Sequence, residues 1–162
     1  MARLKYKIDV SEIREVETKL GKVQLNLSSA ICFPHGIIGF DNLNYYCLCS
    51  IPENKISTGA LLLQSVEDAK LGFIVLPLAE KLYKEQNGLI KYEDILTAAS
   101  SYGIKEENMN IIVIASLTRE NGKPKISINL KAPILVDILE KIAYQHVFVK
   151  NDYPLAFELI PQ

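Results

Sequence analysis

The chain has 162 residues and a formal net charge of −1, from 18 lysines and arginines against 19 aspartates and glutamates. Its length suits one domain, and a composition that is 49% hydrophobic and 23% charged is that of a folded protein, not a disordered one. The balanced charge offers no general attraction to nucleic acid, so we expect no direct nucleic-acid binding.

The sequence has no segment suited to a membrane. No apolar run approaches the ~20 residues that cross a bilayer, and the N-terminal MARLKYKID lacks the apolar core of a signal peptide. We therefore expect a cytoplasmic protein. Cys32, Cys47 and Cys49 form an odd set in a chain without an export signal, which argues against a disulfide framework and predicts reduced, buried thiols.

Short apolar or alternating runs, divided by Gly, Pro, Asn and Asp, predict many strands rather than amphipathic helices. In chain order these strands are predicted at 22–27, 30–33, 45–51, 60–66, 72–76, 110–117, 125–130, 134–136 and 142–149. Asn121-Gly122 tolerates positive φ and predicts a tight hairpin between the sixth and seventh of them.

Two helical segments interrupt the strands. A helical turn is predicted at 79–83, after Pro77. Residues 92–102 (YEDILTAASSY) place apolar side chains at helical spacing, and Gly103 is a plausible helix stop. We therefore predict a mainly β fold: one domain over 1–162, a small β-barrel-like arrangement of short antiparallel strands with one or two short helices.

A search for catalytic or metal-binding patterns gives little. Only His35 and His146 are available as histidine bases, and no nucleophile motif accompanies either. Cys32-x-x-His35 is a two-ligand fragment without a second pair at suitable spacing, so no metal site or cofactor is predicted. We predict no enzyme; the alternative is a small ligand-binding β-barrel or an enzyme using His35 or His146.

Several segments resemble the flagellar assembly factor FliW family. Residues 33–41 (FPHGIIGFD) resemble its Gly-Ile-Pro-Gly-Phe-Glu turn with a preceding phenylalanine; Ile38 replaces the proline and Asp41 the glutamate. In the same order follow resemblances to its LQS, its strand ending in proline, its NL-x-API segment, its late Gln-Val strand and its terminal tyrosine, here at 63–65, 73–77, 129–134, 145–147 and Tyr153. Asp137 and Ala156 depart from the family pattern.

The resemblance implies a β-barrel-like protein without catalytic activity that binds flagellin in the cytoplasm. It also implies binding to the RNA-binding translational repressor CsrA. When secretion depletes flagellin, a FliW protein is released to antagonise CsrA, away from its RNA-binding surface, and flagellin translation rises. The expected role is therefore that of a chaperone-like regulator of flagellum biogenesis that exchanges two protein partners without a cofactor.

Candidate partner-binding residues lie at turns and strand ends, where a scaffold of short strands exposes its features. They are Ile38, Tyr46, Gln64, Asn129 and Pro133. Each has a structural alternative. Ile38 is otherwise a core residue, and Gln64 otherwise bonds a neighbouring loop. Asn129 and Pro133 either shape an edge that accepts a partner strand or have a protective or structural role, in which Pro133 guards that edge. Tyr45 and Tyr46 alternate faces, so one is expected to be buried and the other available to a partner.

An acidic surface is the last expectation. Glu53, Glu67 and Asp68 are candidates for repelling RNA from bound CsrA.

Overall fold

The computed structural model describes residues 12–52 and 59–159, and Glu53 lies outside this part of the chain. Within it, the fold is mainly β with two short α-helices, as predicted. The strands are β1 (Ile13–Thr18), β2 (Gly21–Asn26), β3 (Ile31–Cys32), β4 (Tyr45–Ser50), β5 (Leu61–Ser65), β6 (Gly72–Pro77), β7 (Met109–Glu120), β8 (Lys123–Ile128), β9 (Ile134–Asp137), β10 (Ile142–Gln145) and β11 (Phe157–Leu159). The helices are α1 (Lys81–Lys84) and α2 (Tyr92–Ser101).

The sequence did not predict β1 and β11, and the strand predicted at 142–149 ends at Gln145. Beyond it, the amides of His146 and Phe148 donate to the carbonyls of Pro133 and Lys131, in the same register as the β10–β9 pairs. Pro133 has no amide hydrogen to donate in return, so regular strand pairing does not continue past Ile134.

Strands β3, β4, β5, β6, β7, β9 and β10 form a closed ring, because β7 pairs with both β6 and β9. Its pairs are antiparallel except one: β3 and β10 run parallel, with Ile142 opposite Cys32. The sequence predicted antiparallel strands only. A ring of seven strands cannot alternate direction throughout, so closing it requires a parallel pair.

The interior of the ring is apolar. Inward side chains from alternate positions of every ring strand pack together with Phe33 and Ile37. Those from the strands are Ile31, Tyr46, Leu63, Val75, Ile112, Ile134, Val136 and Ala143.

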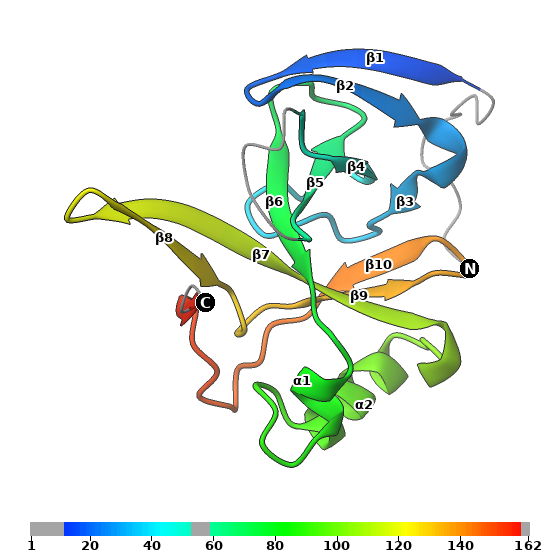
Figure 1. Ribbon diagram of the computed structural model, residues 1–162. Coiled ribbons are helices and arrows are strands. Elements are labelled where there is room, and N and C mark those ends of the chain that lie inside the picture. Colours follow the sequence, from blue (N-terminus) through cyan, green and yellow to red (C-terminus); the bar gives the residue numbers. More distant parts are fainter. Residues whose placement is uncertain (1–11, 53–58, 160–162) are drawn as a thin grey trace.

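Two outer layers cover parts of the ring (Figure 1). The β1–β2 hairpin lies over β4 and β5, where Val23 and Leu25 pack with Cys47 and Leu62. On the other side, α2 packs Ile95, Ala98 and Ala99 against β7 and β9. One expectation is wrong: both Tyr45 and Tyr46 are buried, and Tyr46 packs in the ring interior.

Strands β7 and β8 continue beyond the ring as the hairpin at the left of Figure 1. Asn121 (φ 54°) and Gly122 (φ 77°) form its turn, as the sequence predicted. Helix α2 ends where predicted, with Gly103 at φ 72°. Within the described residues, no helix is long and apolar enough to span a bilayer.

Candidate protein-binding surface at one end of the ring

The ring has two different ends. The register of the strand pairs shows which strand ends lie together at one end of the ring. They are the end of β3, the start of β4, the end of β5, the start of β9 and the end of β10. The loops there are 33–44, 66–71 and 129–133, and we call this the motif end. Segments that are far apart in the sequence therefore meet at one surface.

The loop FPHGIIGF at the motif end is a double turn. The amide of Gly36 donates to the carbonyl of Phe33 over 2.9 Å, and that of Phe40 donates to Ile37 over 2.7 Å. Gly36 has φ 67°, and a Cβ there would lie 2.5 Å from the carbonyl oxygen of Phe40, so glycine is required. The turns bury Phe33 and Ile37 and direct Ile38 and Phe40 outward.

Gln145 joins two of these loops. Its Oε1 accepts a hydrogen bond from the backbone amide of Ile38 over 2.9 Å, and its Nε2 donates to the carbonyl of Ala132 over 3.2 Å. The side chain of Asn129 in turn accepts from the amide of Ala132 over 3.0 Å. One glutamine thus fixes the 33–44 loop against the 129–133 loop.

A second polar network holds the 33–44 loop from its other side. Glu67 Oε1 accepts hydrogen bonds from the amides of Asn44 (2.6 Å) and Tyr45 (2.9 Å). The side chain of Asn44 donates to the carbonyl of Phe33 over 2.9 Å. Ser65 Oγ caps the turn that carries Glu67, accepting from its amide over 3.1 Å. Both flanks of the double turn are therefore tied to ring strands.

Comparison with known proteins decides the family. The family model described as FliW protein matches residues 15–159. The chain belongs to the FliW family. A flagellar assembly factor FliW of Clostridium botulinum (strain Alaska E43 / Type E3) is 30% identical over 142 residues, which cover 88% of this chain and 94% of the relative. That of Thermotoga maritima is 32% identical over 142 residues, 86% of this chain and 88% of the relative.

A solved structure agrees in fold. The crystal structure of a flagellar assembly factor FliW superimposes with a TM-score of 0.67 at 21% identity and covers 92% of this chain and 99% of that one. At this identity the likeness concerns the fold alone.

The structure places the predicted partner-binding residues of this FliW chain in different environments. Ile38 is 60% exposed. Tyr46 is fully buried in the ring, and burial raises the pKa of its phenol to about 12. Gln64 is buried too, and its Nε2 lies 3.2 Å from each of three carbonyls, those of Ser65, Asp68 and Ala69. The structural alternative for Gln64 is thus the one observed.

Asn129 and Pro133 also have internal roles. The side chain of Asn129 is used within its own turn, and Pro133 is buried, its carbonyl accepting from His146. The strand that follows, β9, has β7 and β10 as neighbours on its two sides, so Pro133 does not precede an open sheet edge. These internal bonds fit a structural role for the two residues rather than strand addition or protection of an open edge.

The sequence analysis did not identify Phe40 as a surface residue. Phe40 is 39% exposed and contacts the ring of Phe73 edge-on at 5.7 Å between centroids. Its neighbours Gly39 and Asp41, typical turn residues, are the signal in the sequence that points to exposure. Glu67 and Asp68 are exposed, but Oε1 of Glu67 also holds the double turn.

Asp137, one of the departures from the family pattern, has a clear structural role. Its Oδ1 accepts hydrogen bonds from the amides of Leu139 (3.1 Å) and Glu140 (3.0 Å), closing the turn between β9 and β10. A side-chain oxygen at this position is what the turn requires, and aspartate supplies it.

The two histidines lie outside the ring, on either side of Tyr144. His35 contacts Tyr144 edge-on, Tyr144 stacks on Tyr102, and the hydroxyl of Tyr102 is hydrogen-bonded to His146 Nδ1 over 2.9 Å. Burial lowers the pKa of His146. Together these rings attach the end of α2 to β10. Among the described residues, the side chain hydrogen-bonded to His146 is the Tyr102 hydroxyl, and no serine, threonine or cysteine side chain bonds either histidine.

No group of three or more His, Cys, Asp or Glu side chains suited to hold a metal ion occurs in the described part of the chain. The thiols are buried or half-buried: burial raises the pKa of Cys47 to about 12 and that of Cys49 to about 11.

Proposed function

We propose that this FliW-family protein is a non-enzymatic, cytoplasmic flagellar assembly factor that binds flagellin and, by exchanging partners, antagonises the translational repressor CsrA. Family membership supports the assembly role. The observation that carries the binding role is the double turn at the motif end, which directs Ile38 and Phe40 into solvent.

Exposed apolar side chains on a fixed support suit protein recognition. Ile38 and Phe40 lie on turns whose backbone is held by Gln145, Asn44 and Glu67. A surface that is ordered before binding loses little conformational entropy when a partner covers it, so more of the apolar burial contributes to affinity. This favours the motif end as the first contact for a protein partner.

Acidic side chains beside this apolar pair suit the proposed action on CsrA. Glu67 and Asp68 are exposed on the loop next to it. Carboxylates held close to an RNA-binding protein raise the electrostatic cost of bringing a phosphate backbone to it. We propose that they weaken RNA binding by CsrA within the complex.

The decisive experiment measures binding to both proposed partners. The purified protein would be titrated by calorimetry with flagellin and, separately, with CsrA from its own organism, followed by a competition between them. Binding to both with mutual exclusion is expected. Binding to flagellin alone would leave an assembly factor without the regulatory role, and binding to neither would refute the proposal.

A matched pair of variants tests the motif end itself. Ile38→Asp is expected to weaken binding to the partner that uses this surface by tenfold or more, because a carboxylate would enter an apolar contact. Ile13→Asp is the control, since Ile13 is 66% exposed, similar to Ile38, but lies on β1. Equal effects of the two changes on both partners would show that the motif end is not the binding surface.

The acidic residues require a substitution that keeps the fold. Glu67→Gln retains the oxygen that accepts from Asn44 and Tyr45 but removes the charge. Combined with Asp68→Lys and Glu53→Lys, it should weaken antagonism of CsrA on a flagellin transcript while leaving flagellin binding intact. Unchanged antagonism would exclude the electrostatic role.

Replacing both His35 and His146 by alanine should leave partner binding intact.

A further inference from the structure

The β7–β8 hairpin leaves the ring at the motif end. β6 begins at that end, opposite the end of β5, and its last pair with β7 in that direction joins Val75 and Ile114. Residues 115–120 of β7 therefore extend beyond the ring. β8 pairs with them on one side, and β11 pairs with β8 on the side away from β7. On their other side, no strand within residues 12–52 and 59–159 pairs with them.

The bonds of β7 to its neighbours identify which residues face this open side. The amide of Asn129, which follows β8, donates to the carbonyl of Ile114 over 2.9 Å. On the opposite side, the amide of Leu78, which follows β6, donates to the carbonyl of Ile111 over 2.8 Å. Backbone groups alternate between the two sides along a strand. Even-numbered residues of β7 therefore bond toward β8, and odd-numbered residues face the side of β6, which is open beyond the ring.

The backbone N–H and C=O groups of Leu117 and Arg119 consequently face the open side. Pro124 supports this assignment, because it has no amide hydrogen and lies opposite Arg119, where the alternation leaves the hairpin without a hydrogen bond. Among the described residues, none bonds the backbone groups of Leu117 or Arg119. An extended strand complements such a row of donors and acceptors, whereas a helix uses its own backbone groups internally.

The side chains of the hairpin specify which strand fits. On one face, Leu117 lies in register with Ile126 of β8, which lies in register with Leu159 of β11. Leu117 is 42% exposed, so a strand added beside β7 would extend this row with an apolar side chain next to Leu117. On the other face, Ser116 and Thr118 are exposed and polar. The residue of the added strand that lies on that face is therefore polar.

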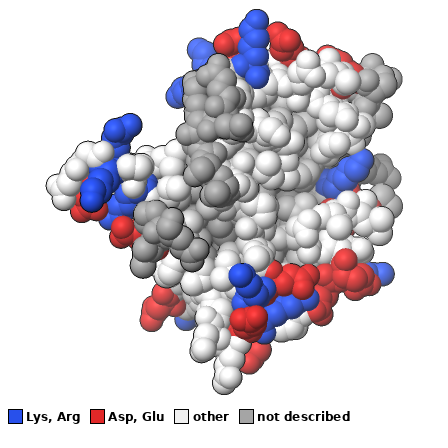
Figure 2. Space-filling view, viewed as in Figure 1, with Lys and Arg blue, Asp and Glu red and all other residues white. Residues whose placement is uncertain are grey.

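Arg119 adds a charge to be matched. It is exposed and forms no ion pair with any residue that the structure describes, whereas Lys125 pairs with Glu120 over 2.9 Å and with Glu158 over 3.4 Å. Figure 2 shows basic side chains at the tip of this hairpin, with acidic ones beside them. Leu117 and Arg119 lie two residues apart on the same face. The matching strand therefore carries an apolar and an acidic side chain two residues apart.

A second copy of this chain does not supply that pattern. Two open β7 edges would pair through their odd-numbered residues, and no odd-numbered residue of β7 is acidic. Arg119 would therefore remain unmatched in such a dimer. Charged residues on an exposed strand edge are also a common protection against self-association.

We propose that the open side of β7 binds an extended segment of a partner protein by strand addition. The backbone of this segment bonds the N–H and C=O groups of Leu117 and Arg119. An apolar side chain lies beside Leu117, an acidic one lies beside Arg119, and the residue between them is polar. The site uses a different element from Ile38 and Phe40, so it does not depend on which partner the motif end binds.

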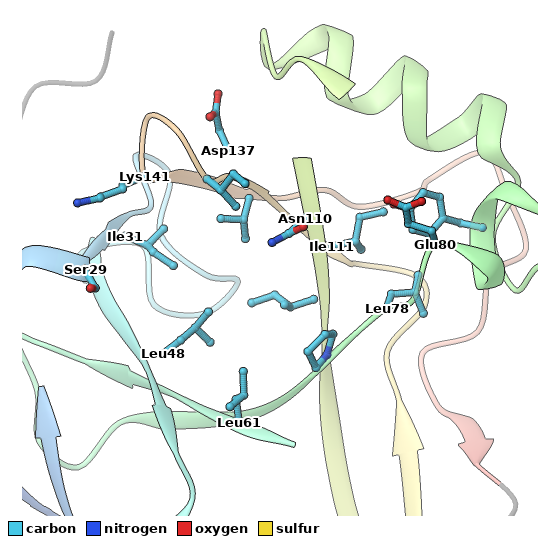
Figure 3. Close-up of a pocket in the computed structure, with 15 residues that line it drawn as sticks. Ser29, Ile31, Leu48, Leu61, Leu78, Glu80, Asn110, Ile111, Asp137 and Lys141 are labelled. Atoms are coloured by element: carbon cyan, nitrogen blue, oxygen red, sulfur yellow. The ribbon is translucent and has the colours of Figure 1, made fainter. Parts of the chain in front are cut away.

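The opposite end of the ring offers a matched control. It holds a pocket of about 420 Å³, whose lining includes Ile31, Leu48, Leu61 and Asn110 (Figure 3). Leu48 is 37% exposed, close to the value for Leu117. Leu48→Asp therefore introduces the same charge at a similarly exposed leucine away from the hairpin.

Peptide selection tests the open edge even though the partner is unidentified. Random peptides displayed on phage would be selected on the full chain and counter-selected on Leu117→Pro. This proline removes an N–H from the open side but none from the bonds to β8, which even-numbered residues make. The best synthetic peptide would be titrated into the wild type and variants by fluorescence anisotropy, with thermal melts to show that each variant is folded.

The expected pattern is specific. Leu117→Pro and Arg119→Glu each weaken binding about tenfold or more, as loss of a hydrogen bond or of a charge pair would. Leu117→Asp abolishes binding, whereas Leu48→Asp and Ile38→Asp leave the affinity unchanged. The selected peptides carry an acidic and an apolar residue two positions apart.

Hydrogen exchange provides a signature of strand addition. In ¹⁵N spectra of the wild type, the bound peptide should slow exchange of the amides of Leu117 and Arg119. The amides of Ser116 and Thr118, which already bond β8, should change little. This alternation follows from pairing of the backbone and not from contact with side chains alone.

Four results would overturn the proposal. The first is that no peptide survives counter-selection. The second is that the selected peptide binds Leu117→Pro or Leu117→Asp as tightly as the wild type. The third is that exchange slows at neither Leu117 nor Arg119. The fourth is that sedimentation of the wild type shows a dimer that Leu117→Asp disrupts, which would assign the edge to a second copy.

Discussion

Gln145 and Ile38, 107 residues apart in the sequence, are joined by a 2.9 Å hydrogen bond from the backbone amide of Ile38 to the side chain of Gln145. The same glutamine donates to Ala132. Gln145 therefore connects two segments that carry the resemblance to the family, residues 33–41 and 129–134. It lies itself in a third such segment, residues 145–147. The position of the exposed Ile38 depends on this link.

Removing the link should destabilise the protein and release the loop. Gln145→Ala leaves the Ile38 amide without its partner, which typically costs about 1–3 kcal/mol of unfolding free energy. Urea denaturation measures this cost, and hydrogen exchange at Ile38 should become faster. Gln24→Ala, at an exposed position of β2, is the control and should change stability by less than about 0.5 kcal/mol. Equal stabilities of the two variants would contradict the linking role.

Two glycines in the same loop should differ in their tolerance of alanine. Gly36 and Gly39 both have positive φ, so each alanine incurs about 1–2 kcal/mol of backbone strain. A Cβ at Gly39 meets nothing within 4 Å, whereas at Gly36 it meets the backbone of Phe40 and Asp41. We expect Gly36→Ala to cost about 3 kcal/mol or more, clearly exceeding Gly39→Ala. Denaturant midpoints of the two variants make the comparison, and equal midpoints would refute it.

Stability should fall in mildly acidic solution because of His146. Burial lowers its pKa in the folded state, so below the unfolded value of ~6.5 the unfolded chain takes up the proton first. Its contribution to stability is therefore complete above that pH and is lost as the pH falls toward the lower, folded pKa. Chemical denaturation at a series of pH values between 8 and 5 measures the slope.

His146→Gln should flatten this slope. His35→Gln is the control, because His35 is exposed on the other side of Tyr144 and its replacement leaves His146 in place. A slope that persists in His146→Gln would assign the pH dependence to other groups.

The cysteines should be unreactive in the folded protein. The thiolate is the reactive form, and burial raises the pKa of Cys32, of Cys47 to about 12 and of Cys49 to about 11. With Ellman's reagent at pH 8, reaction should be slow in the native state and should reach three thiols per chain after unfolding in guanidinium. Rapid native reaction of any thiol would contradict this burial.

Local patterns in the sequence determined much of the fold. Alternating apolar runs located the strands from β2 to β10, Asn121-Gly122 located the β7–β8 turn, and helical spacing followed by Gly103 located α2. These features depend on contacts between near neighbours in the chain, which a single sequence displays directly. Strands β1 and β11 were not predicted, because β1 has many charged and few apolar residues and β11 has only three residues.

The candidate sites were decided by the tertiary structure. Tyr46 and Gln64 lie at strand positions that alternation alone leaves open. Tyr46 is buried because it packs in the ring interior, and Gln64 is buried where its side chain bonds the carbonyls of Ser65, Asp68 and Ala69. Closure of the ring brings Gln145 to Ile38 and places Asn110 at the opposite end. These contacts depend on pairing between strands that are distant in the sequence. A local sequence pattern does not predict which strands pair.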